Sequence, residues 1–233
     1  MPRSRLIVLI LLAGAAILCT TLGVWQTRRL LERRAINTVL VAKRERALVA
    51  LPSTLPDDSL VERRVLAGGR YDRAHEFVIR GHVYNEIPGV QLVTPLVPDS
   101  GPAVLVLRGF APAINGVDPD SNDLDEFGPI TLTGLARPIV ALGDSGQPLR
   151  RELGTTYRYL DFDAVTAALP YPVHRFVVQR TGPPTGWPRA AEAAPLNDGP
   201  HINYMIQWYS MAVISVATLG VILFKKPAPP APP

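Results

Sequence analysis

The residues with the clearest chemical potential lie directly before the last apolar segment of the chain. His201 stands at the polar entrance of this segment, and Tyr204, Trp208 and Tyr209 follow it. Residues three and four apart share a face of a helix, and a neutral imidazole is the commonest protein ligand for metal ions and hemes. The pattern leaves two interpretations open: an interfacial aromatic anchor with a solvated histidine, or a ligand site at a membrane surface.

Two uncharged runs of about 20 residues, Leu6–Trp25 and Met205–Phe224, frame the chain. At ~1.5 Å rise per residue, a helix of that length crosses a hydrocarbon core of ~30 Å. We therefore expect transmembrane helices at 1–26 and 201–224. A cleavable signal peptide is the competing interpretation of the first run. It is disfavoured because the run is longer than the usual apolar core of ~7–15 residues.

The segments between and after these spans differ in pattern. Residues 27–46 alternate arginines with aliphatic residues and predict an amphipathic helical extension, with the arginines near anionic headgroups. Residues 47–200 carry short β-rich runs, of which Val90–Val97 and Ala103–Phe110 form the clearest strand pair. The Pro-rich tail at 225–233 cannot pack a core. The predicted fold class is an α+β membrane protein with one mainly antiparallel β domain and few short helices.

Several local features of the β domain are predicted from turn and breaker residues. Gly68-Gly69 indicates a bend, and Pro88-Gly89 indicates a loop. We expect a short strand at Tyr157–Leu160. Asp161 is expected to cap a short helix at Phe162–Leu169, because the prolines that follow end it.

Composition excludes several classes of protein. The net charge is a modest +4, and the arginines are scattered among acidic residues rather than interleaved with stacking aromatics, so we expect no nucleic-acid partner. Cys19 is the single cysteine and lies in an apolar run. An intrachain disulfide and a CxxC metal or thiol-exchange site are therefore impossible within this chain.

The sequence contains little that is typical of an enzyme. It has no phosphate-binding GxxxxGK loop, no HExxH, no GxSxG and no strand-led GxGxxG. His75 and His82 are seven residues apart, but a metal site would need further ligands that the sequence does not single out. The acidic pairs Asp57-Asp58 and Asp161/Asp163 resemble turn and cap residues. We therefore expect no catalytic residues, and a membrane-anchored envelope enzyme is the minor alternative.

Arg108 is followed by Gly109 at the end of an apolar strand. A buried arginine needs a carboxylate or backbone partner, and a glycine permits close backbone approach. Two interpretations follow. The guanidinium pairs with a neighbouring strand or loop, or it recognises the carboxylate of a ligand such as a heme propionate.

Taken together, these residues resemble the Surfeit locus protein family, whose members are assembly factors for the heme-copper enzyme cytochrome c oxidase. The resemblance rests on four groups of residues in order along the chain: Leu22-Gly23-Val24-Trp25-Gln26 with Arg29; Gly69-Arg70-Tyr71-Asp72; Pro88-Gly89 with Val93-Thr94-Pro95-Leu96 and Val104 to Phe110; and His201 with Tyr204, Trp208 and Tyr209. The sequence departs from the family pattern at Asp198-Gly199-Pro200, at Tyr209 and at Leu107.

The resemblance implies a function and a set of site residues. A member of this family holds or delivers heme A to the catalytic subunit of the oxidase, with His201 as the candidate axial ligand of the heme iron. Trp208 and Tyr209 would pack against the ring, Tyr204 would lie beside them, and Arg108 would face a propionate. The implied partners are the oxidase subunit, other assembly proteins and membrane lipid. The alternative is a structural or docking subunit that binds no heme.

The resemblance and the charge pattern disagree about topology. The family implies a protein of the cell membrane with both termini cytoplasmic and the large domain outside. Arg3, Arg5, Lys225 and Lys226 agree with that orientation, whereas the basic residues directly after Trp25 favour a cytoplasmic domain: Arg28, Arg29, Arg33 and Arg34.

Overall fold

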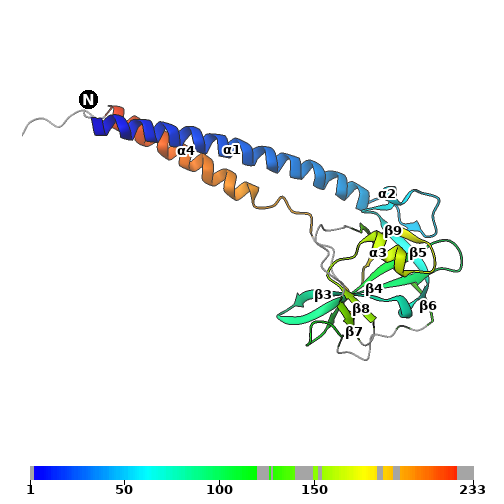
Figure 1. Cartoon of the computed structure of the whole chain (residues 1–233). Coiled ribbons are helices and arrows are strands. Elements are labelled where there is room, and N and C mark those ends of the chain that lie inside the picture. Colours follow the sequence, from blue (N-terminus) through cyan, green and yellow to red (C-terminus); the bar gives the residue numbers. More distant parts are fainter. Residues whose placement is uncertain are drawn as a thin grey trace, which may run out of the picture. The chain divides into compact units, whose positions relative to one another are not determined.

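The computed structural model describes residues 3–119, 126, 128–139, 149–151, 154–182, 186–190 and 195–224. The predicted Pro-rich tail, 225–233, lies outside the described residues. The chain forms two compact units, residues 1–39 with 196–233 and residues 40–195. The first unit contains two long helices, and the second contains the β domain (Figure 1).

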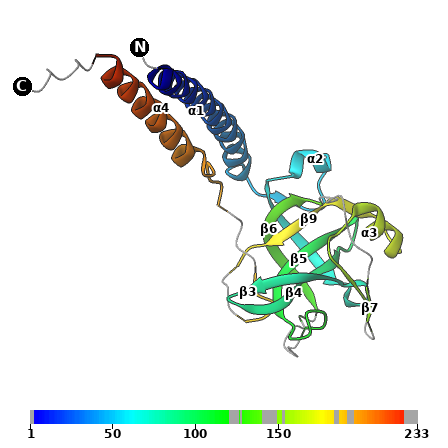
Figure 2. The ribbon, with the colours of Figure 1, turned by 60° about the vertical axis from the view of Figure 1, so that its left-hand side comes forward.

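The first unit is an antiparallel pair of helices, α1 (Arg3–Arg44) and α4 (His201–Phe224), which lie side by side in both views (Figures 1 and 2). Both helices are long and apolar enough to cross a membrane. The predicted first span and its amphipathic extension form one continuous helix. Near the N-terminus of α1, Arg5 donates a hydrogen bond to the carbonyl oxygen of Ile222.

One face of α1 forms the contact with α4. Its buried residues recur at spacings of three, four and seven: Cys19, Gly23, Gln26, Leu30 and Asn37. This periodicity is that of a helix–helix seam, in which the same side of a helix returns every 3.5 residues. Most aliphatic side chains on the other faces are exposed, as expected for surfaces that contact lipid.

The second unit is built on one sheet of nine strands among the described residues, with short helical segments beside it. The strands are β1 (Val49–Ala50), β2 (Arg64–Tyr71), β3 (Phe77–Tyr84), β4 (Ile87–Val97), β5 (Ala103–Pro112), β6 (Pro129–Pro138), β7 (Leu149–Arg151), β8 (Gly154–Tyr157) and β9 (Val173–Arg180). The helical segments are α2 (Asp57–Leu60), α3 (Phe162–Ala168) and the 3-10 turn η1 (Arg73–His75).

The sheet closes on itself. Strands β2, β6, β9, β5 and β4 follow one another, and β4 also pairs with β2 through Tyr71 and Leu96. This closure joins β2 to β4 and encloses an apolar core, while β1 and β7 remain at the two ends of the strand order. Most pairings are antiparallel, while β1–β2, β3–β8 and β5–β9 are parallel. The core contains buried Val, Leu and Phe side chains from these strands, among them Leu96, Val106 and Phe176.

The structure confirms the predicted pairing of β4 with β5 and the cap of α3, where the Asp161 carboxylate accepts the backbone N–H of Asp163 at 3.2 Å. It also confirms the fold class: two candidate membrane-spanning helices at the ends of the chain flank a β-rich domain with few short helices.

Three local predictions were wrong. Gly68-Gly69 does not bend the chain but lies within β2, where a Cβ at Gly69 would collide with the carbonyl oxygen of Val97. Pro88-Gly89 lies within β4, because Gly89 gives Phe110 and the backbone of β5 room to approach. The strand expected at Tyr157–Leu160 is β8, which ends at Tyr157. In the two glycine cases the absent side chain serves close packing rather than a turn.

Candidate functional site

His201 begins α4 and is held by a residue of the other helix. Its Nδ1 atom lies 2.9 Å from Oε1 of Gln26, a buried residue of the α1 seam. An amide oxygen only accepts hydrogen bonds, so Nδ1 carries a proton, and in the neutral imidazole Nε2 then keeps its lone pair. Ligand histidines are oriented in this way when the second ring nitrogen donates to a protein oxygen.

The side of the ring that carries Nε2 faces a glycine. A Cβ at Gly199 would lie 3.5 Å from Nε2, and Gly199 has a φ of +71°, which disfavours other residues there. Among the residues that the structure describes, no hydrogen bond involves Nε2. The nitrogen is therefore available as a ligand, and the residue beside it leaves space.

The segment before α4 is tied to α1. The backbone carbonyl of Asn197 accepts a hydrogen bond from Asn37 at 3.0 Å, and the Asp198 carboxylate pairs with Arg34 at 2.9 Å. The backbone N–H of Gly199 donates to the side chain of Asn197 at 3.1 Å. These contacts fix the position at which the chain enters α4, and hence the position of His201.

The three aromatic residues after His201 have different surroundings. Tyr209 faces α1: a Cβ at Gly23 would lie 2.6 Å from its ring, and its hydroxyl lies 3.2 Å from the Thr27 hydroxyl. Tyr204 is 47% exposed and Trp208 is partly buried. Tyr209 is thus engaged in the helix contact, while Tyr204 and Trp208 present ring surface within two turns of His201.

Arg108 lies elsewhere, in the β domain. Its side chain is fully buried, with Nη1 3.1 Å from Glu76 and Nη2 3.5 Å from Glu126. The guanidinium also lies over the ring of Tyr71, 5.0 Å from its centroid. Burial, together with the Glu126 carboxylate, raises the pKa of Tyr71 to about 12. In the structure the Arg108 guanidinium therefore pairs with carboxylates of its own domain, which is the first of the two interpretations that the sequence left open.

The match to a known protein family extends from the first helix through the β domain into the second helix. The model of the SURF1 family matches residues 13–213 of this chain. The chain belongs to the SURF1 family. It is also similar to a SURF1-like protein of Monosiga brevicollis, with 26% identity over 221 residues that cover 88% of this chain and 83% of the relative.

The family match includes the parts of both helices that form the His201 site. The structure brings His201, Tyr204, Trp208 and Tyr209 together on α4 and adds Gln26, Gly23 and Gly199, which sequence reasoning did not assign to the site. Gln26 directly follows the first uncharged run, and this position at the end of a span was the only feature of the sequence that could have pointed to it. A partner across the seam becomes visible only once the register of the two helices is known.

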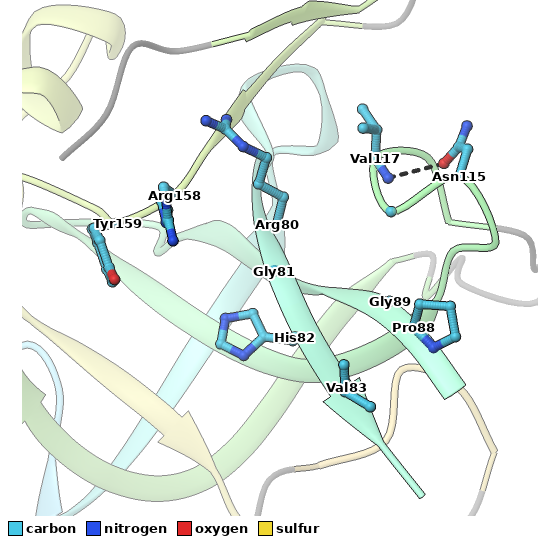
Figure 3. Close-up of a pocket in the computed structure, with 11 residues that line it drawn as sticks. Arg80, Gly81, His82, Val83, Pro88, Gly89, Asn115, Val117, Arg158 and Tyr159 are labelled. Atoms are coloured by element: carbon cyan, nitrogen blue, oxygen red, sulfur yellow. Dashed lines mark hydrogen bonds between the residues drawn. The ribbon is translucent and has the colours of Figure 1, made fainter. Parts of the chain in front are cut away.

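The other histidines and aspartates that the sequence analysis considered as metal or catalytic residues lie in the β domain of this SURF1 family member. His75 faces the Asp72 carboxylate at 2.7 Å, whereas His82 lines a pocket with Arg80 and Arg158 (Figure 3). Asp57 faces His174 at 2.7 Å. The described part of the chain contains no group of three or more His, Cys, Asp or Glu side chains that could hold a metal ion. The pocket was not predicted from the sequence.

Proposed function

We propose that this protein is a membrane-anchored assembly factor for a heme-copper cytochrome c oxidase and that it holds heme A at the polar end of its helix pair. The SURF1 family is generally linked to oxidase assembly, which supports the first part. The second part rests on the hydrogen bond between His201 and Gln26, which engages Nδ1 and leaves Nε2 as the nitrogen that can ligate iron in the neutral imidazole.

The residues around His201 fit a heme by their donor chemistry. A neutral imidazole with an oriented Nδ1–H is a suitable axial ligand, and Gly199 leaves room beside Nε2. Trp208 and Tyr204 supply aromatic surface for an apolar macrocycle. When bound, heme A would contribute the iron that accepts the imidazole nitrogen. Gln26 orients the ring, and Tyr209 supports the helix contact rather than the ligand.

Arg108 has no part in this proposal. A propionate contact would require an accessible guanidinium, but this one is fully buried against Glu76 and Glu126. The proposal therefore assigns Arg108 to the stability of the β domain.

The proposed orientation has both termini in the cytoplasm and the β domain outside the cell membrane. Two antiparallel spans return the chain to its starting side, as the contact of Arg5 with Ile222 illustrates. Gln26 and His201 then lie together at the opposite membrane surface. Fusing a periplasm-active reporter after Pro195 and a cytoplasm-active reporter after the C-terminus tests this orientation. Reversed activities would contradict it.

The heme proposal is tested by purifying the protein in detergent from cells that make heme A and recording its optical spectrum. We expect a heme A band that is lost in His201→Ala and kept in Gln207→Ala, a matched change at an exposed position of α4. Absence of heme from the wild-type protein in the presence of heme A would favour the docking subunit instead.

A further inference from the structure

The polar end of the helix pair carries an excess of positive charge. Four arginines of α1 follow the buried residue Gln26: Arg28, Arg29, Arg33 and Arg34. The first unit contains two acidic residues, Glu32 and Asp198. The basic residues begin directly beyond the uncharged run that ends at Trp25. Such an excess of one charge raises the local concentration of ligands of the opposite charge, so this end of the two helices favours an anion.

The two acidic residues account for two of the four arginines. Arg29 contacts the Glu32 carboxylate at 3.0 Å. Arg34 contacts the Asp198 carboxylate at 2.9 Å, in the segment that enters α4. Within the described part of the chain, the other two arginines, Arg28 and Arg33, have no carboxylate partner. These two guanidinium groups are therefore the candidates for binding an anionic ligand.

Helix geometry separates these two arginines. Arg33 is seven residues after Gln26, which is about two turns, so both lie on the side of α1 that faces α4. Accordingly, the Nε atom of Arg33 donates to the backbone carbonyl of Asn197, just before α4, at 3.5 Å. Arg28 is two residues after Gln26 and is exposed on the opposite side of the helix. Of the two, only Arg33 shares a face with the residue that holds His201.

The contact with Asn197 positions Arg33 but is weak. Its length of 3.5 Å is at the long limit of a hydrogen bond. The same carbonyl oxygen accepts a shorter hydrogen bond, of 3.0 Å, from the side-chain amide of Asn37. Because the Arg33 side chain is exposed, a ligand can reach it. A carboxylate is a stronger acceptor for a guanidinium than a backbone carbonyl, so Arg33 can exchange this contact for a charged ligand.

We propose that Arg33 binds a propionate carboxylate of the heme held by His201, an inference that rests on the proposed function. Carboxylates are costly to bury without a partner, so they favour the end of the site that lies away from the apolar spans. Arg33 lies in that direction, about 10 Å along α1 from Gln26. Its planar guanidinium can bind both oxygens of one carboxylate. Arg33 thereby takes the role that one interpretation of the sequence gave to Arg108.

The test is optical titration of the full-length protein in detergent with heme A and with its propionate dimethyl ester, which lacks both carboxylate charges. Arg33→Gln should weaken the binding of heme A about fivefold, the upper size for an exposed ion pair. It should leave the affinity for the ester unchanged, because the ester cannot form the ion pair. Arg28→Gln removes the same charge from the opposite side of α1 and should bind both compounds as the wild-type protein does.

Further comparisons separate this contact from folding and from ligation of the iron. Arg33→Lys keeps the charge but loses the planar fork, so it should bind heme A with intermediate affinity. The histidine-type spectrum should persist in every arginine variant, because His201 is unchanged. The inference is overturned if Arg33→Gln binds heme A like the wild-type protein, or if it weakens the binding of both compounds equally. If the wild-type protein binds neither compound, the proposed function itself fails, and this inference with it.

Discussion

Gln26 of α1 and His201 of α4 form a 2.9 Å hydrogen bond, although 175 residues separate them along the chain. Gln26 is buried in the helix seam and adjoins the end of the first uncharged run. The bond therefore joins the C-terminal end of the first span to the N-terminal end of the second. It also determines which nitrogen of His201 carries the proton.

Replacing Gln26 by Leu tests whether this orientation matters. Loss of the acceptor leaves the imidazole without its partner and free to take the other tautomer. Residues that orient a ligand typically contribute 10–100-fold to affinity. We expect heme A affinity, measured by optical titration, to fall by about that factor in Gln26→Leu. Equal affinity in Gln26→Leu and the control Gln207→Leu would show that Gln26 has no orienting role.

Gly23 should be required for close packing of the two helices. A Cβ there would lie 2.6 Å from the Tyr209 ring, closer than real side-chain contacts allow, whereas a Cβ at Gly14 meets nothing within 4 Å. Gly23→Ala should therefore increase the separation of spin labels at Ile17 and Val216, measured by pulsed electron resonance in a Cys19→Ser background. Gly14→Ala should leave the separation unchanged. An unaltered distance in Gly23→Ala would contradict the described seam.

Arg108 should stabilise the β domain. Arg108→Met leaves the carboxylate of Glu76 without its buried partner, and breaking a buried ion pair costs about 3–5 kcal/mol. We expect a loss of this size in urea unfolding, and faster hydrogen exchange in β4 and β5. Glu76→Gln in the same chain should recover part of the loss. Arg64→Met, at an exposed position, is the control, and similar losses in both arginine variants would refute the assignment.

Asp72 gives the domain a predictable response to pH. Burial acts to raise its pKa, but hydrogen bonds from Tyr171 at 2.6 Å and His75 at 2.7 Å dominate and hold the pKa of Asp72 below its usual range. A depressed carboxyl pKa stabilises the fold above the unfolded value of about 4, and this stabilisation is lost as the pH falls through the folded pKa.

Asp72→Asn should therefore lower the free energy of unfolding by about 1–2 kcal/mol at pH 7, since charge-assisted hydrogen bonds are weakened. The difference from wild type should shrink as the pH is lowered below about 4. Urea unfolding at pH 7 and pH 3 measures it. Asp163→Asn, at an exposed position of α3, is the matched control. A difference that grows on acidification would contradict the assigned sign.

Sequence patterns identified the elements with strong local signals. The two spans follow from uncharged runs of membrane-crossing length, and the β4–β5 pair follows from two β-rich runs around a loop. The close backbone approach expected at Gly109 is also present, because the carbonyl of Arg189 lies against it. The spans and the β4–β5 pair depend on residues that are near one another in the chain, whereas at Gly109 the sequence indicated the close approach but not its partner, Arg189.

The remaining features depend on register between distant segments. Gln26 meets His201 only through the pairing of α1 with α4, and the pocket-lining residues Arg80 and Arg158 are brought to one pocket only through the parallel β3–β8 ladder. Gly69 resembles a turn residue in the sequence but serves the crossing of β2 and β4. Local propensity carries no information about such partners, so the pocket and the role of Gln26 could not be predicted.

The central claim is that His201 ligates heme A, and imidazole rescue tests it most directly. His201→Gly removes the side chain, and titration with heme A should then give no histidine-type spectrum. Added imidazole should restore that spectrum in the variant, because it replaces the missing ligand. The account is contradicted if His201→Gly binds heme A with the wild-type spectrum and affinity in the absence of imidazole.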